Sequence, residues 1–240
     1  MAILSKEEFL KMNQEKTERS TQQKSDTPFI GYFKLADDGD EAIVRFNYST
    51  PDDLYNDVLT VHPGNAETKW KKINCINDVK AGVTNCPLCA AGVPLQQRFF
   101  IKLVEYVRAD DGSIVPYARV WDRPTSYIQI LANLFAEYGD ISDCVFKIKR
   151  SGAKGDMQTT YSIMFGNPSI YNNQLYVKDF SAFDGYKIIG SQVLDKTFQE
   201  LGVMAREMSG FDSAVIGATD LHQQAPTPQA NTAAPRRITY

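Results

Sequence analysis

One stretch of the chain, from His62 to Cys89, holds one of the two histidines and three of the four cysteines among its 240 residues. The Cys86-Pro87-Leu88-Cys89 segment is typical of a metal knuckle, in which a tight turn aims two sulfur atoms at one ion. Three thiolates and one imidazole complete the tetrahedral coordination of Zn²⁺ and leave no position for water. The stretch therefore predicts one structural zinc ion. Its predicted ligands are His62, Cys75, Cys86 and Cys89.

Two other uses of these cysteines fit the sequence less well. A redox Cys-x-x-Cys pair normally opens a helix after a strand in a βαβ unit, and the residues around Cys86 do not predict such a unit. A disulfide framework needs an oxidising compartment, and the N-terminal residues do not resemble a signal peptide. We therefore expect a zinc-binding, cytoplasmic protein.

The composition limits the partners that the chain can have. With 43% hydrophobic and 23% charged residues it is typical of a soluble protein, and no apolar run approaches the roughly 18 residues of a membrane helix. The net charge is −3, so a nucleic-acid site would need local charge segregation. Residues 69–108 carry seven lysines and arginines against two acids, whereas residues 37–57 carry seven acids against one arginine. We expect no membrane partner.

The chain divides into three parts. Residues 1–27 predict a short helix, begun by the capping box at residues 5–8, and a flexible arm that either frays or contacts a neighbouring subunit. Residues 28–212 form the predicted core, which includes a zinc subdomain at about 57–97. Residues 213–240 are rich in alanine, glutamine, threonine and proline and predict a disordered tail.

The core predicts a mainly β, α+β fold. Alternating patterns at 29–35, 41–48 and 98–108 indicate strands, and an apolar stripe at 125–138 indicates one helix between later strands. A second helix is expected within 191–209. A barrel of short strands with one helix across its end is the arrangement of an OB fold, which commonly binds single strands. We therefore expect an OB-fold-like barrel with an inserted zinc subdomain.

The strand predicted at 98–108 has an unusual face. Arg98, Phe100, Lys102 and Tyr106 alternate on one side of it, while the other side is largely aliphatic. Cations between aromatic rings suit a single-stranded nucleic acid, because lysine and arginine neutralise phosphates and unpaired bases stack on rings. The competing interpretation is an amphipathic hairpin whose long cationic side chains cover the rings.

The residues predicted to contact DNA are cations, which would bind phosphates, and aromatic residues, on which bases would stack. For phosphates they are Arg45, Lys69, Lys71, Lys72, Arg98, Lys102, Arg119, Lys147 and Lys149, and for stacking they are Trp70, Phe100, Tyr106, Tyr117 and Trp121.

Three sets of residues carry a resemblance to a known family. They are Lys34-Leu35 with Gly39 and residues 42–46; His62, Lys69-Trp70, Cys75 and residues 86–89; and, more weakly, residues 195–201. On these the chain resembles the T-even-phage type of single-stranded DNA-binding protein, the helix-destabilising protein of phage replication. The resemblance implies an OB-fold core with one structural zinc on His62, Cys75, Cys86 and Cys89. It also implies single-stranded DNA in a basic, aromatic cleft.

The resemblance extends to partners, with two departures. That family associates with itself along DNA through an N-terminal basic motif, which only Arg19-Ser20-Thr21 resembles here, and it recruits replication or recombination proteins through an acidic tail. From Ala214 onward this chain has one acid, Asp220. We expect a protein that coats single strands in phage replication, recombination and repair, located in the host cytoplasm.

Two other functions compete with this expectation. A zinc-stabilised adaptor between proteins of a transcription or recombination complex would have the same metal and fold but no salt-sensitive affinity for oligonucleotides. An enzyme is not expected, because the chain has no Gly-rich phosphate loop, no His-Glu-x-x-His motif and no acidic nuclease cluster.

Overall fold

The computed structural model describes residues 30–77, 85–156, 158–166 and 175–208. The predicted N-terminal helix and arm and the predicted C-terminal tail lie outside the described residues. Within the described part, no helix is long and apolar enough to cross a membrane.

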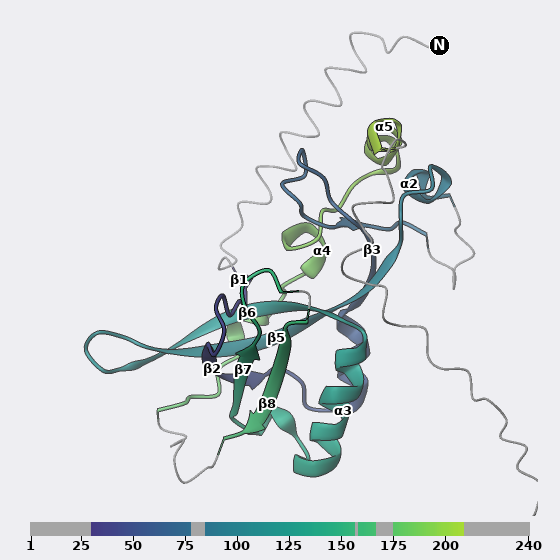
Figure 1. The fold of residues 1–240 in the computed structure, drawn as a ribbon. Coiled ribbons are helices and arrows are strands. Elements are labelled where there is room, and N and C mark those ends of the chain that lie inside the picture. Colours follow the sequence, from purple (N-terminus) through teal and green to yellow (C-terminus); the bar gives the residue numbers. More distant parts are fainter. Residues whose placement is uncertain (1–29, 78–84, 157, 167–174, 209–240) are drawn as a thin grey trace, which may run out of the picture. The chain divides into compact units, whose positions relative to one another are not determined.

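The strands form one eight-stranded sheet whose main path runs β1-β6-β5-β2-β7-β8, with β3 joined to β5 and β4 joined to β3 (Figure 1). Among the described strand pairs, β1 and β6 are parallel and the others are antiparallel. The strands are β1 (Gly31–Tyr32), β2 (Glu41–Phe46), β3 (Val58–His62), β4 (Ile73–Asn74), β5 (Gln96–Arg108), β6 (Ile114–Pro124), β7 (Phe146–Ser151) and β8 (Thr160–Phe165).

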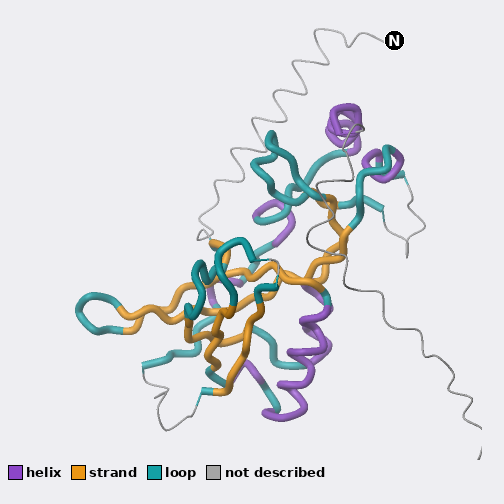
Figure 2. The backbone as a smooth tube through the Cα atoms, viewed as in Figure 1, coloured by secondary structure: helices purple, strands orange, loops and turns teal. Residues whose placement is uncertain are grey.

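Strand β5 joins the main path of the sheet to the β3–β4 pair, because it is long enough to pair with two strands along one edge. Its first residues, 96–99, pair with β3, and residues 103–106 pair with β2. Along its other edge it forms a continuous hairpin with β6, which extends from the sheet as two long strands (Figure 2). His62, one of the predicted zinc ligands, is the last residue of β3 and is joined to the sheet in this way.

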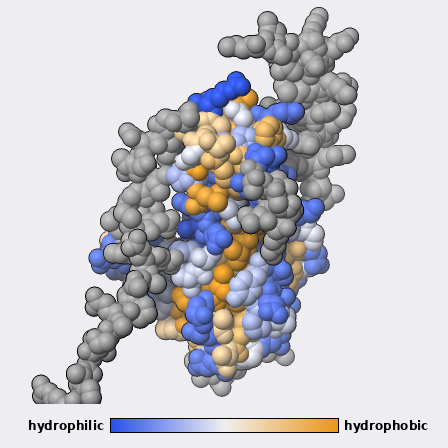
Figure 3. Space-filling view, turned by 90° about the vertical axis from the view of Figure 1, so that its right-hand side faces the viewer, coloured by the Kyte–Doolittle hydropathy of each residue, from blue (hydrophilic) through white to orange (hydrophobic). Residues whose placement is uncertain are grey.

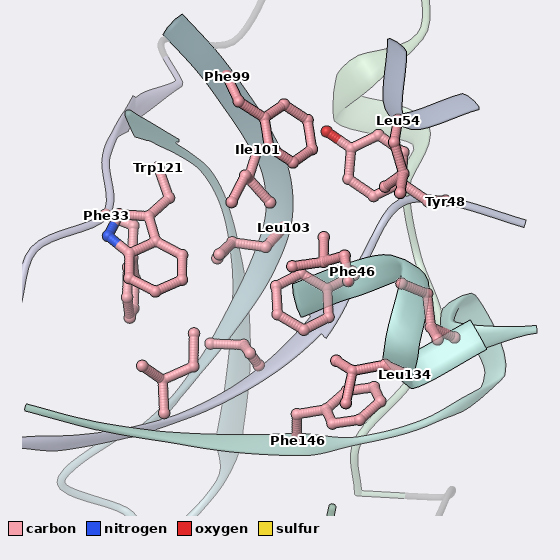
Figure 4. Packing of buried hydrophobic residues seen from close by; sticks show 14 of the residues in the cluster. Phe33, Phe46, Tyr48, Leu54, Phe99, Ile101, Leu103, Trp121, Leu134 and Phe146 are labelled. Carbon is pink, nitrogen blue, oxygen red and sulfur yellow. The ribbon is translucent and has the colours of Figure 1, made fainter. Parts of the chain in front are cut away.

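Helix α3 (Ser126–Tyr138) covers one face of the sheet, as the apolar stripe predicts. Leu131, Leu134 and Phe135 are its buried residues, and the helix ends at Gly139, whose φ of +73° suits glycine. Beneath it lies the main core, a set of large side chains from several strands (Figure 4). Among them are Phe33, Phe46, Tyr48, Leu54, Phe99, Ile101, Leu103, Trp121 and Phe146.

The opposite face of β5 is also covered, which the sequence did not predict. Phe100 and Tyr106 lie in a second core with Phe183, Tyr186 and Ile188, which come from the segment after β8. That segment holds the short helices η3 (Ser181–Phe183) and α4 (Ile188–Ser191). The alternation of β5 was predicted correctly, but the face expected to be open is buried.

The mixed α+β architecture, made mainly of strands, is confirmed. The sheet is open: β1 and β8 are the two ends of its path, and no pairing between them is present in the described residues. The predicted barrel is therefore not shown. The remaining short helices are η1 (Pro51–Asp57), η2 (Ile141–Asp143) and α2 (Pro87–Ala90).

Helix α5 (Phe198–Met208) is the helix expected within 191–209. Thr197 and Glu200 form its capping box: the Glu200 carboxylate accepts from the Thr197 N–H at 3.0 Å, and the Thr197 hydroxyl accepts from the Glu200 N–H at 3.3 Å. Helix α5 packs on α2, so the end of the core returns to the metal-binding region.

Candidate metal centre

The four predicted ligands meet in space. One ligand atom from each of His62, Cys75, Cys86 and Cys89 lies within 4.8 Å of all the others. His62 Nε2 is 3.5 Å from Cys86 Sγ and 3.6 Å from Cys89 Sγ, and Cys75 Sγ is 3.6 Å from Cys89 Sγ. A tetrahedral Zn²⁺ with bonds of about 2.3 Å to sulfur and about 2.0–2.1 Å to nitrogen separates such atoms by about 3.5–3.8 Å. The cluster therefore has the size that holds one zinc-like ion.

The β3–β4 hairpin supplies the first two ligands. His62 is the last residue of β3 and pairs with Ile73 in β4. Cys75 follows β4 directly, and its N–H donates to the carbonyl of Thr60 in β3 at 3.1 Å. The ladder thus holds both side chains at one end of the hairpin.

The knuckle supplies the other two ligands. Cys86 caps the N-terminus of α2, whose first residue is Pro87, and its carbonyl accepts from the Ala90 N–H at 3.0 Å. Gly92 leaves the turn with a φ of +75° and donates to the Cys89 carbonyl at 3.0 Å. Local backbone bonds therefore orient both sulfur atoms, as the Cys-x-x-Cys spacing predicts.

A backbone carbonyl fixes the histidine tautomer. His62 Nδ1 lies 3.0 Å from the Pro94 carbonyl, which can only accept, so Nδ1 carries the proton and Nε2 presents its lone pair to the sulfurs. The ring is fully buried, and burial lowers the pKa of His62 below its usual value near 6.5. The imidazole is therefore neutral near pH 7, the form that binds a metal.

The thiols need a compensating cation to ionise together. Burial raises the pKa of Cys75, and burial together with the neighbouring sulfurs raises that of Cys89 to about 12. Burial also acts to raise the pKa of Cys86, but the backbone N–H groups of Cys89, Ile76 and Leu88 outweigh it and lower that pKa. A divalent ion would supply the positive charge that holds all three as thiolates.

The four predicted ligands and the small core that packs around them, which we call the metal region, extend beyond the predicted 57–97 subdomain. Leu201, Ala205 and Met208 of α5 are buried in the same small core as Ile73 and Leu88. The segment before α5 also contributes: the Leu194 N–H donates to the Lys72 carbonyl at 2.8 Å, and the Leu194 carbonyl accepts from the Asn74 N–H at 3.0 Å. The apolar stripe of this helix was visible in the sequence, but its partner was not.

Three of the predicted DNA contacts lie together on the loop between β3 and β4. Lys69, Trp70 and Lys71 are exposed, and 66% of Trp70 is accessible. Lys69 and Trp70 have φ values of +52° and +61°, the only positive values among described non-glycine residues. The loop closes tightly, since the Trp70 N–H donates to the Asn65 carbonyl at 2.8 Å.

Most of the other predicted cations face carboxylates. Lys72 and Arg98 both bind Asp122, at 2.6 and 2.8 Å. The remaining pairs are Lys102 with Asp57 at 2.8 Å, Arg119 with Glu105 at 3.1 Å, and Lys147 and Lys149 with Glu41 at 3.0 and 3.4 Å. The strands therefore do not present an unbroken positive face.

Four of the predicted contacts are buried, which corrects the expectation for them. Phe100, Tyr106 and Trp121 have at most 6% of their surface exposed and belong to the two cores, so their rings are not open to bases. Arg45 is 2% exposed and donates to the Tyr106 hydroxyl at 3.1 Å and to two backbone carbonyls. Tyr117 remains exposed, with the Arg119 guanidinium 5.1 Å from its ring centre.

A scan against protein-family models finds no match to this chain, and neither does a search of curated proteins. The geometry establishes a mixed α+β protein with a buried cluster of one histidine and three cysteines.

Proposed function

We propose that this protein binds single-stranded DNA without sequence preference and coats it during replication, recombination or repair. The observation that carries the proposal is the loop at residues 63–72, which presents Trp70 between Lys69 and Lys71. An indole open to solvent offers a face on which any base stacks, and adjacent ammonium groups neutralise the phosphates on either side of it.

The loop presents Trp70 in a fixed position. Asn65 and Thr68 bond each other in both directions, with the Asn65 N–H donating to the Thr68 hydroxyl at 2.8 Å and the Thr68 N–H donating to the Asn65 side chain at 3.0 Å. Gly64 is required here, because a Cβ would lie 2.1 Å from the Lys71 carbonyl oxygen. The positive φ values of Lys69 and Trp70 are unfavourable for such side chains, and backbone strain held by surrounding bonds is typical of functional sites.

The metal centre supports this loop directly. His62 and Cys75 are ligands on either side of it, so an ion would hold the two ends of the loop together. Lys71 Nζ donates to the Ser191 carbonyl at 3.2 Å, which links the loop to the segment before α5. The proposed role of the zinc is therefore to position Trp70 and its neighbours, with no part in chemistry.

The test is a titration with oligo-dT at two salt concentrations, following both the anisotropy of a labelled oligonucleotide and the tryptophan fluorescence. We expect quenching of Trp70 and an affinity that falls with salt. Trp70→Ala should weaken binding about five- to a hundredfold with an unchanged salt slope, because one stacked base is worth about 1–3 kcal/mol. The matched control is Tyr55→Ala, which removes an aromatic ring that is 63% exposed.

The lysines on the loop should respond differently. Lys69→Ala with Lys71→Ala should reduce the slope of log K against log salt by about 1.4, since each single-strand phosphate contact contributes about 0.7. An unchanged slope, or a loss of affinity as large in Tyr55→Ala as in Trp70→Ala, would contradict the proposal.

One observation favours the adaptor function. Leu95, Phe198 and Val203 belong to or adjoin the metal region and are at least 52% exposed, and apolar surface is visible among hydrophilic residues on one face (Figure 3). Absence of any oligonucleotide binding at low salt, in protein carrying one zinc per chain, would replace the DNA-binding proposal with this one.

A further inference from the structure

One cleft brings several cations together without an acid. A hollow of about 470 Å³ is lined by four cations, Lys34, Arg123, Arg150 and Lys154, together with Phe33, Leu35, Ala36, Trp121, Gly155 and Tyr161. No acid lines it, and within the described residues none of the four cations forms an ion pair. Elsewhere on β5, β6 and β7 the predicted cations face carboxylates, so this concentration of charge is exceptional.

Arg123 lies against aromatic rings. Its guanidinium carbon is 4.2 Å from the ring centre of Tyr161, 4.7 Å from that of Trp121 and 5.5 Å from that of Tyr127. Its Nε is buried and has no hydrogen-bond partner among the described residues. Stacking fixes the plane of the guanidinium while leaving a donor unused, and an unmade buried hydrogen bond is costly.

Arg150 fixes the two loops that bring the lysines to the cleft. It is 9% exposed and donates to the Leu35 carbonyl at 3.0 Å, beside Lys34, and to the Gly152 and Ala153 carbonyls at 3.1 and 3.0 Å, beside Lys154. These partners are neutral, so the charge of Arg150 stays uncompensated. Two acids bind the backbone of these loops without lining the cleft: Asp38 accepts from the Gly152 N–H at 2.8 Å, and the Asp40 carboxylate accepts from the Ala36 N–H at 2.8 Å.

The cleft and the Asp122 cluster lie on opposite faces of β6. Trp121 and Arg123 point to the main core and the cleft, whereas the intervening residue, Asp122, binds Lys72 and Arg98. The sheet therefore separates the cleft cations from the carboxylate that neutralises the cations nearest to the metal region.

We propose that this cleft binds the phosphate group of a nucleotide, with Lys34, Arg123 and Lys154 as its ligands and Arg150 as the residue that positions the two lysines. A phosphate dianion accepts several charge-assisted hydrogen bonds, which suits a guanidinium fork beside two ammonium groups better than a single carboxylate does. The hollow has the size of a small-ligand pocket, and the rings of Trp121 and Tyr161 that line it lie against the Arg123 guanidinium and hold it in place.

The bound phosphate would belong either to a free nucleotide or to a nucleic-acid strand. The second rests on the proposed function and would make the cleft a second DNA contact, separate from the Trp70 loop. The chemistry of recognition is the same in both.

The experiment is calorimetric titration of the full chain at low salt with dTMP and, as a probe without phosphate, thymidine. We expect dTMP to bind and thymidine not to bind. The double variant Lys34→Ala, Lys154→Ala removes two exposed rim side chains and should weaken dTMP binding at least about tenfold. The matched control is Lys178→Ala, Lys187→Ala, which removes the same charge from two exposed lysines that do not line the cleft and should change the affinity less than about twofold.

Failure of dTMP to bind, equal binding of thymidine, or an equal loss in the two double variants would overturn the phosphate site. Octathymidylates with and without a 5′-phosphate then identify the source. Tighter binding of the phosphorylated strand, or a loss for both strands in the Lys34, Lys154 variant, supports a strand phosphate. A loss for dTMP alone supports a free nucleotide. Trp70→Ala separates this site from the proposed function, because it should weaken only the octathymidylates.

Discussion

The sheet region and the metal region of this protein are stabilised by different means. Beneath α3 the sheet buries large rings, including Phe46, Phe99, Trp121 and Phe146, each at most 2% exposed. The core of the metal region contains no aromatic residue among the described ones, and two of its buried members are the ligands Cys75 and Cys86.

This difference shows what each region needs in order to fold. Burial of large apolar side chains stabilises a sheet without any cofactor, at roughly 1.5–3 kcal/mol for each fully buried side chain. A core of a few aliphatic residues is too small to hold an independent unit, and such units commonly depend on a metal. We infer that a bound ion would stabilise the metal region as the aromatic core stabilises the sheet.

Of the changes considered, removal of the metal should have the largest effect, and it should destabilise the metal region and spare the sheet region. Structural zinc contributes about 10–16 kcal/mol in zinc-finger peptides, so a strong chelator or Cys86→Ser should unfold the metal region. Hydrogen exchange should then increase at 58–62, 73–74 and 198–208 while α3 and β7 stay protected. Cys144→Ser, which removes a cysteine outside the cluster, is the control. Equal exchange in both regions would refute the division.

Truncation in the sheet core should have the next largest effect. Phe146 is fully buried, and Phe146→Ala should lower the free energy of unfolding by about 3–5 kcal/mol through lost burial and the cavity left behind. The variant should still bind one zinc per chain, measured by metal analysis of the folded fraction. Loss of zinc in parallel with sheet stability would mean that the two regions fold as one unit.

Truncation in the metal region should cost somewhat less. Leu201 is fully buried where α5 covers the cluster, and Leu201→Ala should destabilise this region by about 2–4 kcal/mol, measured by urea unfolding of the zinc-loaded protein. Val203, two residues along the helix, is 56% exposed, and Val203→Ala should change stability by less than about 0.5 kcal/mol. Equal effects would show that α5 does not pack on the cluster in solution.

Acidification should lower the stability of the metal region reversibly, by a smaller amount, and leave the sheet region unchanged. The pKa of His62 is lowered in the folded protein, so the unfolded chain takes up a proton first as the pH falls. The stabilisation from this group is complete above about pH 6.5 and is lost as the pH falls through the folded-state pKa. The apparent zinc affinity, measured by competition with a chelator of known affinity, should therefore fall between pH 7 and pH 5 while the α3 amides stay protected. An apparent affinity that is the same at pH 7 and pH 5 would contradict this assignment of the histidine.

Removal of Trp70 should have the smallest effect on stability. An exposed loop side chain contributes little packing, so Trp70→Ala should change the free energy of unfolding by less than about 0.5 kcal/mol, measured by urea unfolding. Together with the expected loss of oligonucleotide affinity, this would separate binding from folding. A large loss of stability would instead mean that the ring packs against the molecule.

Local chemistry explains why some features could be predicted from the sequence. The clustering of His62, Cys75, Cys86 and Cys89 was predictable because few residue types bind zinc and their spacing is short. Helix α3 was predictable because its apolar stripe and the terminal Gly139 are both local signals. The alternation along β5 likewise indicated which side chains share a face.

Other features depended on contacts between distant segments, so the tertiary structure decided them. Alternation along β5 does not reveal what covers each face, and the segment around Phe183 and Tyr186 buries Phe100 and Tyr106. The pairing of Lys72 and Arg98 with Asp122, and the gathering of Arg123 and its neighbours without an acid, likewise join residues far apart in the chain.

The sequence by itself determined which histidine and cysteines cluster, the helical stripe and the strand periodicity, because each follows from the chemistry of neighbouring residues. Only the tertiary structure decided which faces stay open and which charges stay unpaired. Burial and ion pairing depend on segments such as α5 and residues 180–193, which pack against strands far from them in the chain.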